Sequence, residues 1–166
     1  MRAPFLFLLA ILFGINLYGQ VNADSLLQVW NNPNQIDTNR LNAIAEINWE
    51  YYRYTKPDTL FNVAQTQYNF AKKTGNQKWM AIALGTQGAF YFMKSDPNQG
   101  QKYLTESRDL SEKINYHKGT ANAILNLGSL KLKKGNLTGA NDNFIEALAI
   151  YEKIGFKEGI ATAYMN

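Results

Sequence analysis

Few side chains in this 166-residue sequence have the types and spacing that catalysis or metal binding requires. The sequence contains no cysteine, so thiolate catalysis, disulfide bonds and cysteine-ligated zinc are excluded. Its single histidine, His117, lies in a predicted loop, where we expect a solvent-exposed residue and no general base. Glu46 and Glu50 would share one face of a helix, where we expect a solvated surface. We therefore predict no catalytic residue, no bound metal ion and no cofactor in these residues.

The charge distribution argues against a nucleic-acid-binding protein. The sequence has 17 Lys and Arg against 13 Asp and Glu, a net charge of +4. Its lysines form small groups, such as those at 72–73 and 133–134, and acidic residues interrupt them, whereas a nucleic-acid footprint concentrates basic residues on one face. Because 46% of the residues are hydrophobic, the chain can bury a core. We expect a folded protein that binds no nucleic acid.

An N-terminal apolar segment precedes the predicted fold. Residues 4–17 are apolar apart from Gly14 and Asn16, they follow a basic start at Arg2, and polar residues begin at Gln20. This pattern is typical of a secretory signal peptide, which we place at residues 1–19, with cleavage as late as residue 23 as an alternative. A membrane-spanning helix needs about 20 apolar residues, so a permanent anchor is the weaker alternative. We expect an exported chain, in the periplasm or on the extracytoplasmic face of the inner membrane.

The remaining sequence repeats itself at a distance of 40 residues. Residues 118–126 return as residues 158–166 with four of nine positions identical, and Lys73 and Gly88 return as Lys113 and Gly128. A fixed period of this size indicates a solenoid of stacked supersecondary units. We place an N-terminal helix and linker at residues 24–36, repeat units at 38–75, 76–115 and 116–155, and the start of a fourth unit at 156–166.

Each unit is expected to be a pair of helices. In the third unit, apolar spacing predicts helices over 118–134 and 137–154, separated by Gly135 and the N-cap residue Asn136. In the second unit, Asp96 is expected to cap a helix that Pro97 opens. No segment alternates between apolar and polar residues, so we predict no strand. We expect Gly88 and Gly128 to let neighbouring helices approach closely.

This pattern resembles the tetratricopeptide repeat (TPR) family. Leu127 and Gly128 stand at the leucine–glycine pair of that family. The resemblance implies an all-α, right-handed solenoid of helical hairpins with repeats of roughly 40 residues. HEAT repeats share this period and are the alternative, although they do not combine the leucine–glycine pair with this second-helix spacing. Further matches are Tyr51, Tyr91, Ala140, Phe144 and Ala147, and departures from the pattern are Gln67, Ser107, Arg108 and Lys131.

The N-terminal arrangement resembles that of large bacterial signalling proteins. In these, an extracytoplasmic TPR region precedes a membrane helix and a cytoplasmic nucleotide cyclase or histidine kinase domain. The matching features here are the apolar segment, a short helix that ends at Trp30 and a linker over 36–41. Residues 159–166 supply no polar closing helix, so we expect the N-terminal part of a longer, non-catalytic signalling scaffold. The alternatives are the N-terminal part of a cyclase or kinase whose catalytic domain lies elsewhere, and a self-contained secreted scaffold.

The TPR resemblance also implies a binding groove lined by the first helix of each unit. A groove with aromatic walls and basic groups would suit an acidic or carboxylate-ended peptide. For Trp49 and Phe92, packing in the core is an equal alternative, and the open end of the solenoid could also mediate self-association. The groove residues that the resemblance implies are Trp49, Tyr52, Arg53, Ala89, Phe92, Met93, Ser129, Leu132 and Lys133.

Overall fold

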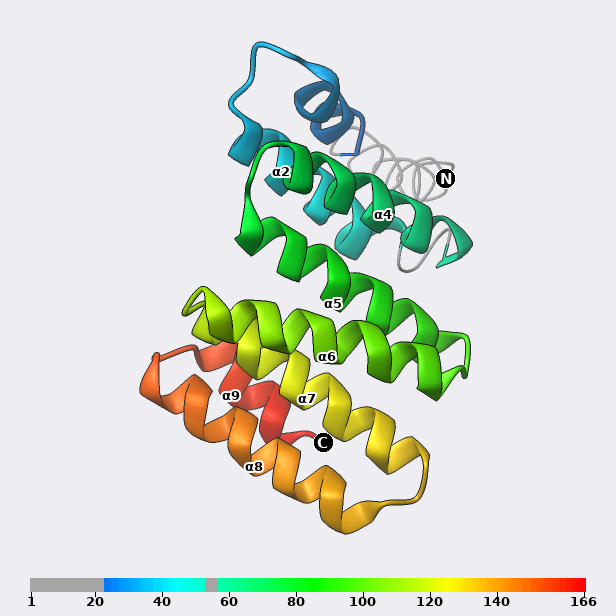
Figure 1. The fold of residues 1–166 in the computed structure, drawn as a ribbon, viewed down its shortest axis with the longest axis vertical. Coiled ribbons are helices and arrows are strands. Elements are labelled where there is room, and N and C mark those ends of the chain that lie inside the picture. The colour runs from blue at the N-terminus through cyan, green and yellow to red at the C-terminus, as the bar shows by residue number, and fades with distance from the viewer. Residues whose placement is uncertain (1–22, 53–56) are drawn as a thin grey trace, which may run out of the picture. The chain divides into compact units, whose positions relative to one another are not determined.

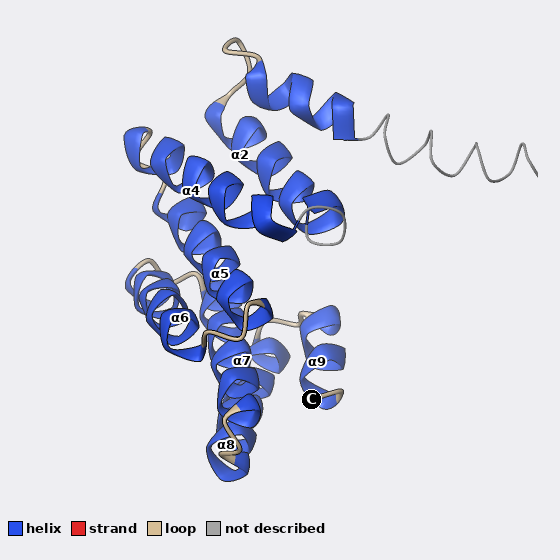
Figure 2. Cartoon of the chain, turned by 90° about the vertical axis from the view of Figure 1, so that its right-hand side faces the viewer, coloured by secondary structure: helices blue, strands red, loops and turns tan. Residues whose placement is uncertain are grey.

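The computed structural model describes residues 23–52 and 57–166. The chain divides into two compact units, Met1–Thr55 and Lys56–Asn166, and each is described by itself. The signal peptide predicted for residues 1–19 lies outside the described residues. Those residues that are described form helices, turns and loops and contain no strand, as predicted (Figure 2).

The second unit is a stack of helices in which each one packs against its neighbour in sequence, while α5 (Gln77–Met93) also contacts α7 (His117–Lys133) (Figure 1). Every second helix begins 40 residues after the one before it, at Gln77, His117 and Lys157. This spacing matches the repeat in the sequence, and the predicted all-α solenoid is confirmed. The helices are α4 (Pro57–Lys73), α5 (Gln77–Met93), α6 (Pro97–Lys113), α7 (His117–Lys133), α8 (Leu137–Lys153) and α9 (Lys157–Tyr164).

The helix boundaries follow the capping residues of the sequence. As predicted, Asp96 accepts a hydrogen bond from the backbone N–H of Gln99 (3.1 Å), and Asn136 accepts one from that of Gly139 (2.9 Å). The two predicted helices of the third unit are α7 and α8, each within one residue of the predicted ends. One correction concerns His117, which is the first residue of α7 and not a loop residue, although it is exposed as expected.

The same turn ends every helix from α4 to α8. After α4, the N–H of Asn76 donates to the carbonyl of Ala71 (2.8 Å) and that of Gly75 donates to Lys72 (3.3 Å), which are the two bonds of a Schellman motif. The residue at this turn has a positive φ each time, a conformation that glycine adopts most easily. These residues are Gly75 (70°), Ser95 (58°), Asn115 (55°), Gly135 (79°) and Gly155 (66°).

Small residues bring the helix axes of the second unit together. A Cβ atom added to Gly88 would lie 2.5 Å from Cγ of Leu104, and one added to Gly128 would lie 2.6 Å from Cε1 of Phe144. Both glycines are therefore required for packing, as predicted from their recurrence. Ala140 belongs, with Phe144, to a buried cluster that joins α7, α8 and α9.

The first unit departs from a regular helical repeat. Residues 23–31 are helical, as predicted for the short helix that ends near Trp30. The linker expected over 36–41 is wrong, because α2 (Asp37–Glu46) begins immediately after Ile36 and buries Leu41 and Ile44. After α2 the chain continues as a π-helix, η1 (Ile47–Tyr52), which the apolar spacing of the sequence did not indicate.

Among the described residues, no helix has the length and apolar character needed to cross a membrane.

The buried tyrosine of α8 makes stability depend on pH. Tyr151 is 2% exposed, its hydroxyl donates to Oδ1 of Asn122 (2.7 Å), and burial, with a smaller effect of Tyr116, raises its pKa to about 12. In the unfolded chain this pKa is about 10, so above pH 10 the unfolded state loses a proton that the folded state keeps.

We expect the free energy of unfolding to be unaffected by this group below pH 10 and to fall as the pH rises towards 12. Denaturant titrations at pH 9, 10, 11 and 11.5 measure the slope, and Tyr151→Phe should reduce it. Burial also raises the pKa of Tyr103 and Tyr116, so some slope should remain. An identical slope in Tyr151→Phe would contradict the assignment.

Candidate functional site

The predicted groove residues of α5 and α7 lie at the C-terminal turns of two helices that contact each other. Two of them are exposed apolar side chains, Met93 (39% exposed) and Leu132 (41%). Ala89 and Ser129 are half-buried, and the Ser129 hydroxyl donates to the carbonyl of Leu125 in its own helix (3.2 Å). Exposed apolar atoms are therefore the feature of this surface that a ligand could bury.

Lys133 joins the ends of α5 and α7. Its Nζ donates to the carbonyl oxygen of Phe92 (3.0 Å) and to Oγ of Ser95 (2.9 Å), and it lies 4.8 Å from the centre of the Phe92 ring. A cation placed on the last carbonyls of a helix stabilises that helix end. Lys133 is exposed, as expected, but its charge is directed to the end of α5 rather than presented freely to a ligand.

Phe92 contributes to the core between repeats. Its side chain is partly buried and packs against the cluster of Leu104, Leu127 and Leu130. Of the two alternatives for this residue, the structure supports the packing role, with part of the ring remaining accessible.

The groove residues of the first unit are described only in part. Trp49 is half-buried in η1. The side chain of Tyr52 and all of Arg53 lie outside the described residues. The aromatic walls expected from Trp49, Tyr52 and Phe92 therefore stay a prediction.

A cleft that the sequence did not predict lies between α6, α7 and α8. It has a volume of about 270 Å³. Ile124, Leu127 and Leu130 of α7 contribute apolar atoms to it, and all three are nearly buried. Polar side chains from three helices complete the lining, and these are Gln101, Thr105, Arg108, Lys131, Lys134, Asn143 and Glu146.

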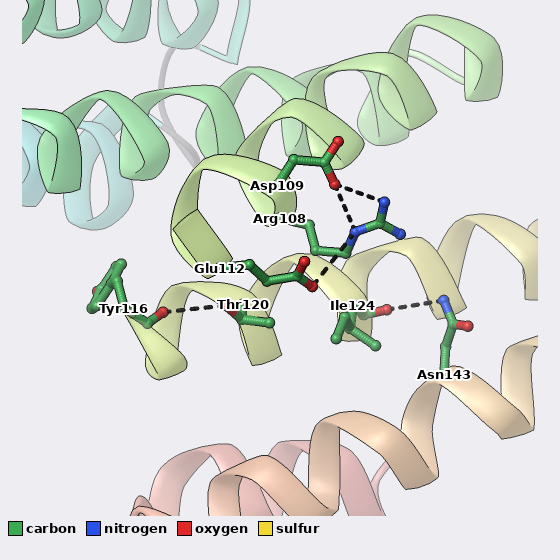
Figure 3. Close-up of polar contacts among 7 residues, drawn as sticks. All are labelled: Arg108, Asp109, Glu112, Tyr116, Thr120, Ile124 and Asn143. Carbon is green, nitrogen blue, oxygen red and sulfur yellow. Dashed lines mark hydrogen bonds and ion pairs between the residues drawn. The ribbon is translucent and has the colours of Figure 1, made fainter. Parts of the chain in front are cut away.

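Hydrogen bonds hold several polar side chains of this cleft in place. Nζ of Lys131 donates to Oδ1 of Asn143 (2.9 Å), and Nδ2 of Asn143 donates to the carbonyl of Ile124 (3.3 Å), which links α7 to α8. Figure 3 shows the Asn143 side chain pointing from α8 towards the Ile124 carbonyl. Arg108 donates to Oδ1 of Asp109 from both Nε (3.0 Å) and Nη2 (2.7 Å).

The signal for this cleft was present in the sequence as departures from the repeat. Arg108 and Lys131 replace an apolar and an aromatic residue of the TPR pattern, and both line the cleft. A third departure, Ser107, is instead structural, because its buried hydroxyl donates to the carbonyl of Ala81 (2.8 Å). Gln67, the fourth, is fully buried in α4. Without a structure, nothing distinguishes departures that line a cleft from departures inside the core.

In the described part of the chain, no group of three or more His, Cys, Asp or Glu side chains is arranged to hold a metal ion.

Comparisons with known proteins agree with the fold. Residues 79–153, which run from α5 to α8, match the family model of the tetratricopeptide repeat. The crystal structure of BtubC (BKLC) from P. vanneervenii is similar, with a TM-score of 0.63 and 14% sequence identity over 81% of this chain and 54% of that chain. The present chain thus spans about half the length of that protein. Because the sequence identity is low, the structural similarity shows a shared fold alone. A search of curated proteins gave no match. The tetratricopeptide repeat match thus applies to residues 79–153, and the helical-hairpin stack of the second unit agrees with it.

Proposed function

We propose that this chain is a non-catalytic scaffold that binds a protein or peptide on the surface formed by α5 and α7. The observation that carries the proposal is the pair of exposed apolar side chains, Met93 and Leu132, on the C-terminal turns of two helices that contact each other. Helical solenoids commonly bind partners along the surface formed by equivalent helices of successive repeats. Covering these apolar atoms removes them from water, which favours binding, and this gain is reduced by the cost of ordering the flexible Met93 side chain.

The bonds of Lys133 refine the kind of peptide expected. Because Lys133 is engaged with Phe92 and Ser95, the acidic peptide that the sequence suggested would have to compete with these hydrogen bonds. Apolar peptide side chains can contact Met93 and Leu132 without such competition. The proposed ligand is therefore a segment with apolar anchors, in which an acidic residue near Lys133 adds little affinity.

The binding surface can be tested with peptides selected from a display library against the wild-type protein. We expect Met93→Glu and Leu132→Glu to weaken binding of the selected peptides at least tenfold, because each places a charge where an apolar contact forms. Ile145→Glu is the matched control, since Ile145 is an exposed apolar residue (57%) on α8. Equal affinity in all four proteins, measured by fluorescence anisotropy, would contradict the proposed surface.

The cellular setting is a further part of this proposal. We place the scaffold outside the cytoplasm, as the sensory or interaction region of a larger signalling protein, on the support of the apolar segment at residues 4–17. Mass spectrometry of the protein expressed with its native N-terminus should show a mature chain that begins after residue 19 or 23. An unprocessed chain found in the cytoplasm would overturn this location.

A further inference from the structure

The cleft between α6, α7 and α8 contains neither Met93 nor Leu132 of the proposed peptide surface. Lys131 lines the cleft, whereas Ser129 belongs to the predicted groove. Residues two positions apart on an α-helix are separated by about 200° around its axis, so the side chains of Ser129 and Lys131 leave α7 in nearly opposite directions. The cleft and the proposed peptide surface are therefore formed by different residues of α7.

The cleft is lined by two lysines, Lys131 and Lys134, whose hydrogen bonds go to neutral side chains. Nζ of Lys131 bonds to the amide oxygen of Asn143 (2.9 Å), and Nζ of Lys134 bonds to those of Gln101 (3.2 Å) and Asn98 (3.3 Å). Within the described residues, neither lysine forms an ion pair with an acidic side chain. Lys134 is the C-cap residue directly after α7, three positions beyond Lys131, so the two residues lie on the same side of this helix end. Both ammonium groups are bonded to neutral acceptors, that of Lys131 on α8 and that of Lys134 on α6, so they face the cleft from its two sides.

The other charges of the cleft are arranged differently. Arg108 is paired with Asp109 (2.7 Å) and lies 3.8 Å from a carboxylate oxygen of Glu112, so its charge is largely balanced (Figure 3). Glu146 lines the cleft from α8, one helical turn beyond Asn143. A carboxylate at this point repels a second negative charge on a ligand. The cleft is thus suited to one anionic group and not to two.

We propose that this cleft binds a small organic monocarboxylic acid with a short aliphatic chain. The carboxylate accepts hydrogen bonds from Lys131 and Lys134, which charge assistance strengthens. The aliphatic chain lies against the apolar atoms of Ile124, Leu127 and Leu130. The volume of about 270 Å³ lies just below the range of about 300 to 1,000 Å³ that is typical of pockets for drug-sized ligands, so the cleft suits a small ligand such as a short acid.

The test is a titration of the ¹⁵N-labelled protein with sodium hexanoate, followed by backbone amide chemical shifts. We expect saturable shifts in α6, α7 and α8, no comparable shifts with neutral hexanamide, and weaker binding of the dicarboxylate adipate. Lys131→Gln and Lys134→Gln should each weaken hexanoate binding at least fivefold. Glu146→Gln should strengthen it and admit adipate. Lys153→Gln is the matched control, because Lys153 is an exposed lysine in the last turn of α8 outside the cleft.

Other results of these titrations would contradict the proposed site. Lys131→Gln removes the bond to Asn143 and could disturb the fold, but Lys134 is exposed and its variant keeps the test valid. Linear, non-saturable shifts, or equal binding in Lys134→Gln and the wild type, would overturn the site. The two lysines would then serve only to balance the partial negative charge at the end of α7. Binding of the peptide acetyl-Leu-Glu-amide without any binding of hexanoate would overturn the free acid as the ligand.

Discussion

The Leu104→Ala variant should unfold with a free energy of unfolding about 2–5 kcal/mol lower than that of the wild type. Leu104 is 0% exposed and packs in one cluster with Leu127 and Leu130 of the next helix, α7. Truncation leaves a cavity at the junction between the second and third repeats, and surrounding side chains close such cavities only in part. Urea denaturation followed by far-ultraviolet circular dichroism measures the change. Leu137→Ala is the control, since Leu137 is 66% exposed and its truncation should cost less than about 0.5 kcal/mol.

A double-mutant cycle shows whether the loss arises at the contact with Gly88. A Cβ at position 88 would lie 2.5 Å from Cγ and 2.7 Å from Cδ2 of Leu104. Gly88→Ala should therefore destabilise the protein by about 1–3 kcal/mol, although alanine favours a helix over glycine by about 1 kcal/mol. In the Leu104→Ala background these two atoms are absent, and the same change should cost far less. Additive effects would show that the close approach of α5 and α6 does not depend on this pair.

The Phe144→Ala variant should lose about 3–5 kcal/mol of stability, because a buried ring is removed from the contact between α7 and α8. Phe144 is 9% exposed and fills the space left by Gly128. Ile145→Ala is the matched control, since Ile145 is the next residue of the same helix and is 57% exposed. Its truncation should change stability by less than about 0.5 kcal/mol. The measurement is again the free energy of unfolding in urea.

Hydrogen exchange shows where the Phe144→Ala variant is weakened. In a solenoid each hairpin contacts mainly its neighbours, so stability is lost locally. Amide exchange should accelerate more in α7, α8 and α9 than in α4 and α5. A uniform acceleration would show that the second unit unfolds as a single cooperative block.

Much of the fold was predictable from the sequence because its determinants are local. Asp96, Asn136 and Gly135 act through the backbone groups of the adjacent turn, so their types were enough to set the ends of α6, α7 and α8. The recurrence of Gly88 and Gly128 likewise indicated close helix packing before any contact was known. The π-helix at Ile47–Tyr52 was missed, since its six residues form little more than one turn and are too few to reveal a different period in the apolar spacing.

The candidate sites depended on contacts between residues far apart in the chain. Lys133 bonds to Phe92 across 41 positions, and Lys134 bonds to Gln101 across 33, so neither partner could be inferred from spacing within one helix. The same arrangement directs Lys133 to the end of α5 and leaves Lys131 and Lys134 beside an open cleft. Periodicity and capping chemistry were thus sufficient for a stack of helical hairpins. Which charges remain available to a ligand follows from how successive hairpins pack. Only that packing brings residues of other repeats next to a side chain, and these neighbours decide what the side chain bonds to.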